Sequence, residues 1–402
     1  MSAPIDVSDR PAGSVKEEGR FLLGLTGPGS HVLTTEPGRG NLIVGPPAMG
    51  RKADLHVAPD DAIRWQALDP FATPAGSPWP RHLDYHGNDS GFFDWSERRP
   101  IEQLSWTPAF ADVRSIDAGR ARIRTLRLVL KDMAGRLGIT LPAGLELSLA
   151  GDLARVRVDA GLPGTLSLHP ALGRRPSAPA YALPELGLLH EARSLSLYGH
   201  PLGQAISLGH LDRFTALERL ALWGGFSDWG ALARLPRLRT LEIRYCADLA
   251  GLPALDAWPM LERLIAFNVD EAAGLGLKVQ VEARGKVRAW DDYTSVSQLR
   301  KPDWWPREYG RPFGAWDSRA AKAANAAYDT ALETLRQARS ADEARAAIVA
   351  FARRFNGMQG IETSQREDIG EAVWQFSRLD RVAGLGVTEA QALQWFDEAR
   401  DY

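Results

Sequence analysis

Leu217-Glu-Arg-Leu220-Ala-Leu222, Leu238-Arg-Thr-Leu241-Glu-Ile243 and Leu261-Glu-Arg-Leu264-Ile-Ala266 repeat one phrase that ends in an apolar-x-apolar step. Side chains alternate along a strand, so each step predicts a short strand with one buried face. The same step recurs at intervals of 21, 19, 29, 25, 21 and 23 residues. Its first residues are Leu126, Leu147, Leu166, Leu195, Leu220, Leu241 and Leu264. One such strand cannot bury itself, and we expect the units to stack into a parallel sheet.

The phrase and its period resemble the leucine-rich repeat superfamily over about 165 residues. That resemblance implies an α/β solenoid whose strands line a concave face. The tail motifs Phe355-Asn356, Ile361-Glu362-Thr363 and Arg366-Glu367-Asp368 resemble the ends of uncharacterised bacterial leucine-rich-repeat proteins, and this second resemblance implies no activity. The predicted fold is thus a leucine-rich-repeat-like parallel sheet with an irregular N-terminal cap and a C-terminal α-helical bundle.

Composition divides the chain into four parts. Residues 1–118 are rich in proline, glycine and aromatics, with candidate strands at 21–25, 41–44 and 55–57. We expect an irregular cap there, because a terminal repeat must cover its apolar face; a separate ligand-binding domain is the alternative. Repeats fill 119–290, where a proline-rich insertion around 176–184 explains the longest interval. A tryptophan- and proline-rich linker occupies 291–316, and a helical bundle occupies 317–402.

Helix starts are predicted in the last part by three capping boxes. They are Ser340 with Glu343, Ser364 with Glu367, and Thr388 with Gln391. An alanine-rich helix at 318–339 precedes them. Apolar residues recur at helical spacing, and the expected buried positions are Ala324, Tyr328, Ala331, Leu332, Leu335, Ala344, Ala347, Ile348, Phe351, Phe355, Ile369, Ala372, Val373 and Phe376.

Charge and cysteine content limit the function classes. A net charge of −2 argues against a general nucleic-acid binder, which normally has a strong basic excess. One cysteine leaves no internal disulfide, which favours a reducing compartment. The amino terminus has no apolar signal core and no run approaches a membrane span, so we expect a cytoplasmic protein. Arginine greatly outnumbers lysine, a composition typical of GC-rich bacterial genomes.

The best candidate binding surface is formed by the outward positions of the repeat strands. The position after each step is occupied in turn by His169, Tyr198, Trp223, Arg244 and Phe267. Two further outward positions carry charged candidates. Glu242 lies between the two apolar residues of its step, and Arg219 and Arg263 directly precede theirs. Tyrosine, tryptophan and arginine are enriched at interaction hot spots, and the arginines favour an acidic partner, with Glu242 paired locally to either neighbour. The alternative is that the aromatics only stabilise neighbouring strands.

Two motifs resemble catalytic or nucleotide-binding elements, but we predict that each has only a structural role. The stretch Gly45-Pro-Pro-Ala-Met-Gly50-Arg51-Lys52 matches the glycine spacing of a phosphate-binding loop. Arg51 stands at the position of the motif's lysine and Lys52 at the position of its Ser/Thr, so we predict a turn. Cys246-Ala-Asp248 resembles the Cys-x-Asp motif of bacterial leucine-rich-repeat ubiquitin ligases. Cys246, however, occupies the inward Asn/Cys position of its repeat, and the C-terminal helices contain no cysteine.

The competing site lies in the N-terminal aromatic region. His82-Leu-Asp84-Tyr-His86 places two imidazoles and a carboxylate on one strand face, with Asp89 and Asp94 nearby. No further ligand is evident beside these residues, so we predict no metal and no cofactor.

The leading hypothesis is therefore a non-catalytic scaffold or adaptor that binds a protein through the concave repeat face. An immunity protein that sequesters a toxin is one specific version. The alternative is an enzyme or small-ligand binder with its site around His82–Trp95.

Overall fold

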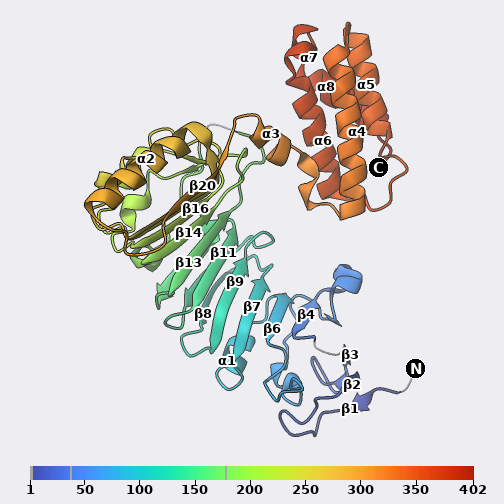
Figure 1. Ribbon diagram of the computed structural model, residues 1–402. Coiled ribbons are helices and arrows are strands. Elements are labelled where there is room, and N and C mark those ends of the chain that lie inside the picture. The colour runs from blue at the N-terminus through green and yellow to red at the C-terminus, as the bar shows by residue number, and fades with distance from the viewer. Residues whose placement is uncertain (1–2, 37–38, 177–178) are drawn as a thin grey trace. The chain divides into compact units, whose positions relative to one another are not determined.

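The computed structural model describes residues 3–36, 39–176 and 179–402. The chain divides into two units, Met1–Lys301 and Pro302–Tyr402, which are described separately (Figure 1). Each unit has a hydrophobic core of its own. No helix in the described ranges is long and apolar enough to cross a membrane.

The first unit is built on a parallel sheet of twelve strands, consistent with the parallel sheet predicted from the leucine steps. Figure 1 shows most of these strands as successive arrows. Their order is β20 (Ser295–Arg300), β19 (Arg263–Asp270), β18 (Thr240–Cys246), β16 (Arg219–Trp223), β14 (Ser194–Tyr198), β13 (Thr165–Pro170), β11 (Glu146–Gly151), β9 (Ile123–Val129), β7 (Ile101–Thr107), β6 (His82–His86), β4 (Asn41–Gly45) and β5 (Leu55–His56).

Leucines of successive strands pair in register and form the core. The first residues of the steps lie opposite one another from Leu126 to Leu264, and the second residues do the same from Leu128 to Ala266. All of these side chains are buried. A shift of one residue in any strand would turn its leucines to the opposite face, so burial fixes the register.

The segments that connect the strands cover the leucine core on the side that faces away from the main sheet. A three-stranded parallel sheet of β8 (Val113–Asp117), β10 (Arg136–Thr140) and β12 (Val156–Ala160) alternates in the chain with the strands of the main sheet. Later connections use the short pair β15 (Ile206–Ser207) and β17 (Phe226–Ser227) and short 3₁₀ turns. The connection from β13 to β14 includes the predicted insertion at 176–184, of which Ser177 and Ala178 lie outside the described residues.

At the β20 end, helix α2 (Glu271–Val287) packs on the core side (Figure 1). Its Leu277 is buried, and its Gly274 lies so close to Leu299 that a Cβ would clash.

The N-terminal region differs from the predicted cap. Strands β4, β6 and β7 belong to the twelve-stranded sheet, and Leu42, Leu83 and Leu104 continue its leucine register. The array thus begins before residue 119. Tyr85 and Trp106 replace leucine at the second buried position, which hides these strands from a leucine pattern. The region also contains the small sheet β1 (Ile5–Asp6), β2 (Gly19–Leu23) and β3 (His31–Thr35) and helix α1 (Phe92–Ser96).

The segment predicted as a linker, 291–316, is also structured. Strand β20 extends the sheet next to β19, and the second unit begins at Pro302. The helices of the second unit are α3 (Trp304–Tyr309), α4 (Ser318–Gln337), α5 (Ala341–Arg353), α6 (Thr363–Ser377), α7 (Asp380–Gly384) and α8 (Glu389–Ala399).

Two of the three predicted helix starts are confirmed. The Ser340 and Thr388 side chains accept hydrogen bonds from the amides of Glu343 and Gln391, and Thr388 completes a capping box. The third is wrong by two residues, because α6 is capped by Glu362 with Gln365. The expected apolar stripes contribute to the second core, with Tyr328 and Leu332 half-buried.

We expect Leu241→Ala to lower the free energy of unfolding by about 2–5 kcal/mol, because it leaves a cavity in the leucine register. Thr240→Ala, on the outward side of the same strand, should change it by less than about 0.5 kcal/mol. Urea unfolding of the full chain, followed by circular dichroism, measures both. Equal losses would contradict the assigned register.

Thr388→Ala should destabilise the second unit by about 1 kcal/mol, because it removes the side chain that caps α8. Ser364→Ala is the matched control, since Ser364 is exposed inside α6 and its hydroxyl donates to the Gln365 side chain and not to a backbone group of the helix end. Thermal unfolding of the full chain compares the two. A loss for Ser364→Ala as large as that for Thr388→Ala would disprove the Glu362 cap.

Candidate functional site

Three rows of side chains project from the main sheet on the side opposite its leucine core, which we call the outward face. Between β13 and β19, the first row contains Thr165, Ser194, Arg219, Thr240 and Arg263. The middle row contains Ser167, Ser196, Ala221, Glu242 and Ile265. The third row, which we call the aromatic column, contains His169, Tyr198, Trp223, Arg244 and Phe267.

The aromatic column is a continuous stack. The rings of His169 and Tyr198 lie 4.1 Å apart at 9°, and those of Tyr198 and Trp223 lie 4.6 Å apart at 12°. The guanidinium carbon of Arg244 is 5.8 Å from the Trp223 ring and 5.9 Å from the Phe267 ring. Parallel strands are spaced by roughly 4.8 Å, so in-register pairing itself brings these rings into stacking contact.

Stacking determines which parts of the column can meet a partner. All five side chains are half-buried. Each aromatic pair contributes roughly 0.5–1.5 kcal/mol beyond its buried area. The stack occupies the faces of the inner rings, so a partner would meet ring edges and polar groups. Among these is the indole N–H of Trp223, which donates to no atom of the described chain.

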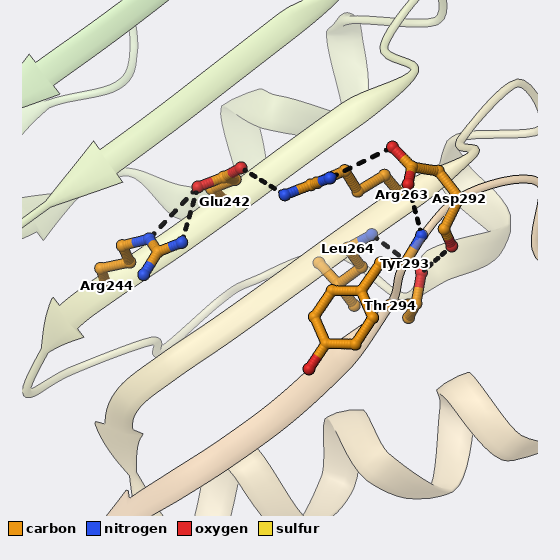
Figure 2. A network of polar contacts seen from close by, with 7 residues as sticks. All are labelled: Glu242, Arg244, Arg263, Leu264, Asp292, Tyr293 and Thr294. Atoms are coloured by element: carbon orange, nitrogen blue, oxygen red, sulfur yellow. Dashed lines mark hydrogen bonds and ion pairs between the residues drawn. The ribbon is translucent and has the colours of Figure 1, made fainter.

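Arg244 and Arg263 form a network of polar contacts centred on Glu242 (Figure 2). Its carboxylate accepts hydrogen bonds from Arg244 Nε at 3.2 Å and Nη2 at 3.1 Å, and lies 3.4 Å from Arg263 Nη2. Arg263 also pairs with Asp292, at 3.2 Å. Glu242 thus pairs with both Arg244 and Arg263, where the sequence offered either neighbouring arginine as its partner. Asp292 was missed because it lies 29 residues from Arg263 in sequence.

The segment before β20 holds Asp292 in place. The amide of Tyr293 donates to Asp292 Oδ1 at 2.6 Å, and Thr294 Oγ1 accepts a hydrogen bond from the amide of Leu264 at 3.2 Å. The Tyr293 amide and Arg263 lower the pKa of the Asp292 carboxyl, which is therefore ionised opposite the guanidinium. Arg244 and Arg263 are thus neutralised within the chain.

Arg219 differs from the other two arginines. It is exposed on the first row, and it forms no ion pair with any carboxylate in the described part of the chain. Of the three arginines named by the sequence, it alone presents an uncompensated charge on the outward face.

Burial and charge both act on His169, at the end of the column. Burial lowers the pKa of its imidazole, and the positive charge of Arg127 on β9 lowers it further. His169 is therefore neutral at neutral pH, as suits a ring stacked on Tyr198.

The competing N-terminal site has its aromatic residues in the core. Phe92, Phe93 and Trp106 are buried and packed against one another, and the buried Trp95 stacks on Trp65. They therefore provide no open aromatic lining. Trp95 donates to Asp69 at 2.8 Å.

The polar residues of that region lie outside this cluster. His82, Asp84 and His86 project from one face of β6, with 3.3 Å between His86 Nε2 and Asp84 Oδ1. Asp94 is exposed on α1. No group of three or more His, Cys, Asp or Glu in the described ranges could hold a metal ion.

The two motifs resembling functional elements are local structure. Residues Pro47–Lys52 form a 3₁₀ turn after β4. Cys246 is fully buried, and its Sγ lies 3.3 Å from the carbonyl oxygen of Arg244. Burial raises the pKa of the Cys246 thiol, which disfavours the thiolate that a nucleophile requires.

Neither a family model, nor a curated protein, nor a solved structure matches this chain. The functional argument therefore depends on the geometry of the outward face.

A pH-dependent stability follows from His169. Its folded-state pKa lies below its ordinary value of roughly 6.5, so folding favours the neutral ring. The contribution of His169 to the free energy of unfolding is complete above the pKa of its imidazole in the unfolded chain. It is lost as pH falls towards the pKa of the imidazole in the folded chain. We expect His169→Phe, which keeps a stacking ring, to show a smaller loss of unfolding free energy between about pH 8 and about pH 5.5. Burial also lowers the pKa of His190 and His200, so part of the pH dependence should persist. Urea unfolding across this range measures the slope, and identical slopes in the two proteins would contradict the assignment.

Proposed function

We propose that this chain is a non-catalytic protein-interaction adaptor whose repeats form a leucine-rich-repeat-like solenoid. In this proposal the outward face is the concave surface that receives a protein partner. The partner makes contact with the aromatic column and with the charged residues beside it, Arg219, Glu242 and Arg263.

The observation that carries the proposal is the aromatic column itself. Five consecutive strands place large side chains in one row, and all five remain half-exposed beside a fully buried leucine core. Tyrosine, tryptophan and arginine dominate binding energy at interfaces because they combine large area with polar groups. The alternative, in which the rings only stabilise neighbouring strands, explains the stack. It gives no role to the unpaired charge of Arg219.

Several features favour a protein partner over other classes. The net charge of −2 does not suit a general polyanion binder. The stacked ring faces leave little aromatic surface for a base or a sugar. The lone cysteine is buried, which supports a protein that works in a reducing compartment such as the bacterial cytoplasm. An immunity protein that sequesters one toxin is a specific form of this proposal, and a neighbouring toxin gene would favour it.

The test is the triple variant Tyr198→Ala/Trp223→Ala/Phe267→Ala. We expect at least about a tenfold loss of partner recovery in isotope-quantified pull-downs, because hot-spot truncations cost about 2 kcal/mol or more each. The matched control is Leu275→Ala/Val279→Ala/Val287→Ala, which removes three exposed apolar side chains from α2.

Circular dichroism and thermal unfolding establish that both triple variants fold. If the column variant folds and retains its partner at the wild-type level, the outward face is not the docking surface.

A further inference from the structure

A band of short side chains runs beside the aromatic column. Ser148, Ser167, Ser196 and Ala221 occupy the middle row on four neighbouring strands, β11, β13, β14 and β16, and we call them the serine band. Each is half-exposed. The hydroxyls of Ser148 and Ser167 form no hydrogen bond within the described chain. The band therefore presents unused hydrogen-bonding groups next to the taller rings of Tyr198 and Trp223.

An arginine lies at each end of this band. Arg127, on β9, is the next member of the middle row, opposite Ser148. Arg219 lies on β16, on the same strand as Ala221 and on the same face. Both are exposed, and neither pairs with a carboxylate in the described ranges. This distinguishes them from Arg244 and Arg263, whose charges Glu242 and Asp292 compensate.

We propose that the serine band receives an extended acidic segment of the protein partner, with one carboxylate held by Arg127 and another by Arg219. This inference depends on the proposed function, because it names the chemistry that the outward face recognises. Arginine forms bidentate hydrogen bonds with carboxylates, and the serine hydroxyls donate to backbone carbonyl oxygens of the segment.

The strand order sets the spacing of the two acidic residues. Four inter-strand steps separate β9 from β16 in the sheet. At roughly 4.8 Å per step they span about 19 Å, and an extended chain rises about 3.3 Å per residue. The two acidic residues should therefore be about six positions apart. The residues between them face serine and alanine on one side and aromatic edges on the other.

One carboxylate of the chain lies in these rows between the two arginines. Glu146 occupies the first row on β11 and accepts a hydrogen bond from Thr125 Oγ1 at 2.9 Å. Its other oxygen lies 3.7 Å from Arg124, so its charge is partly compensated. Glu146 lies one strand from Arg127 and three strands from Arg219, so it disfavours a further acidic residue beside the one that Arg127 holds.

Nucleic acid fits these features less well. A single strand presents a phosphate at every nucleotide, whereas the band offers two separated cations with Glu146 and Glu242 nearby. Single-strand binders also stack bases on open aromatic faces. Here the facing surfaces of His169, Tyr198 and Trp223 are already stacked on one another.

The experiment begins with a random dodecapeptide phage library panned on the full chain. A parallel selection uses Ser167→Trp, which places a bulky ring in the middle of the band. We expect peptides enriched on the wild type and lost on Ser167→Trp to carry two Asp or Glu residues about six positions apart.

Fluorescence anisotropy then measures affinity for the labelled consensus peptide. Arg127→Gln and Arg219→Gln should each weaken binding about three- to tenfold, because each removes a charge-assisted pair. The control is Arg237→Gln, which removes an exposed arginine from the turn before β18. We expect no change for it. A labelled oligothymidine of equal length is the second probe and should bind at least tenfold more weakly than the peptide.

The outcomes separate this inference from the proposed function. Enriched peptides without acidic pairs, lost on the Tyr198→Ala/Trp223→Ala/Phe267→Ala variant, would overturn the acidic segment and leave the docking face intact. Peptides that still bind both Ser167→Trp and the Tyr198→Ala/Trp223→Ala/Phe267→Ala variant would overturn both the acidic segment and the docking face. Failure to enrich any peptide would overturn an extended segment as the ligand. Oligothymidine binding that is tighter than peptide binding and sensitive to Arg127→Gln would replace a protein ligand with nucleic acid.

Discussion

In-register parallel pairing of the leucine strands is the constraint on which the rest of this structure depends. Because Leu220, Leu241 and Leu264 must lie opposite one another to be buried, every outward residue of one strand also lies opposite the equivalent residue of the next. The surface rows are thus a consequence of core packing. A ring that follows the leucine step on one strand necessarily meets the side chain that follows the step on its neighbour, at about the spacing of the strands.

This constraint also determines the electrostatics of the outward face. Glu242 sits in the middle row between Arg244 on its own strand and Arg263 on the next, so one carboxylate compensates two guanidinium groups. Asp292 adds a second carboxylate to Arg263 because β20 pairs with β19. Three arginines that look equivalent in sequence are therefore different in the folded chain. Only Arg219 keeps an uncompensated charge, and Arg127, at the other end of the serine band, shares that property.

The alternation of buried and exposed residues is local, which is why the strands from Leu126 to Leu264 could be read from sequence. Strands β6 and β7 were not predicted, because Tyr85 and Trp106 fill the place of a leucine, and so part of the predicted cap belongs to the main sheet. Asp292 could not be predicted as the partner of Arg263, because that contact depends on an unforeseen strand. The start of α6 was misplaced because Glu362 with Gln365 and Ser364 with Glu367 are overlapping candidates. Arg127 could have been found, because it stands between Leu126 and Leu128 in the first of the leucine steps.

The separation of core and surface has a consequence for specificity. Substituting an outward residue such as Ser167 or Arg219 leaves the leucine register untouched, so the chemistry of the face can change without loss of the fold. The aromatic column is less free, because each ring stacks on its neighbours and the loss of Tyr198 would expose faces of both His169 and Trp223. The column is thus suited to provide general affinity. The serine band and its two arginines, which have few intramolecular contacts, are where selectivity for one partner can be encoded.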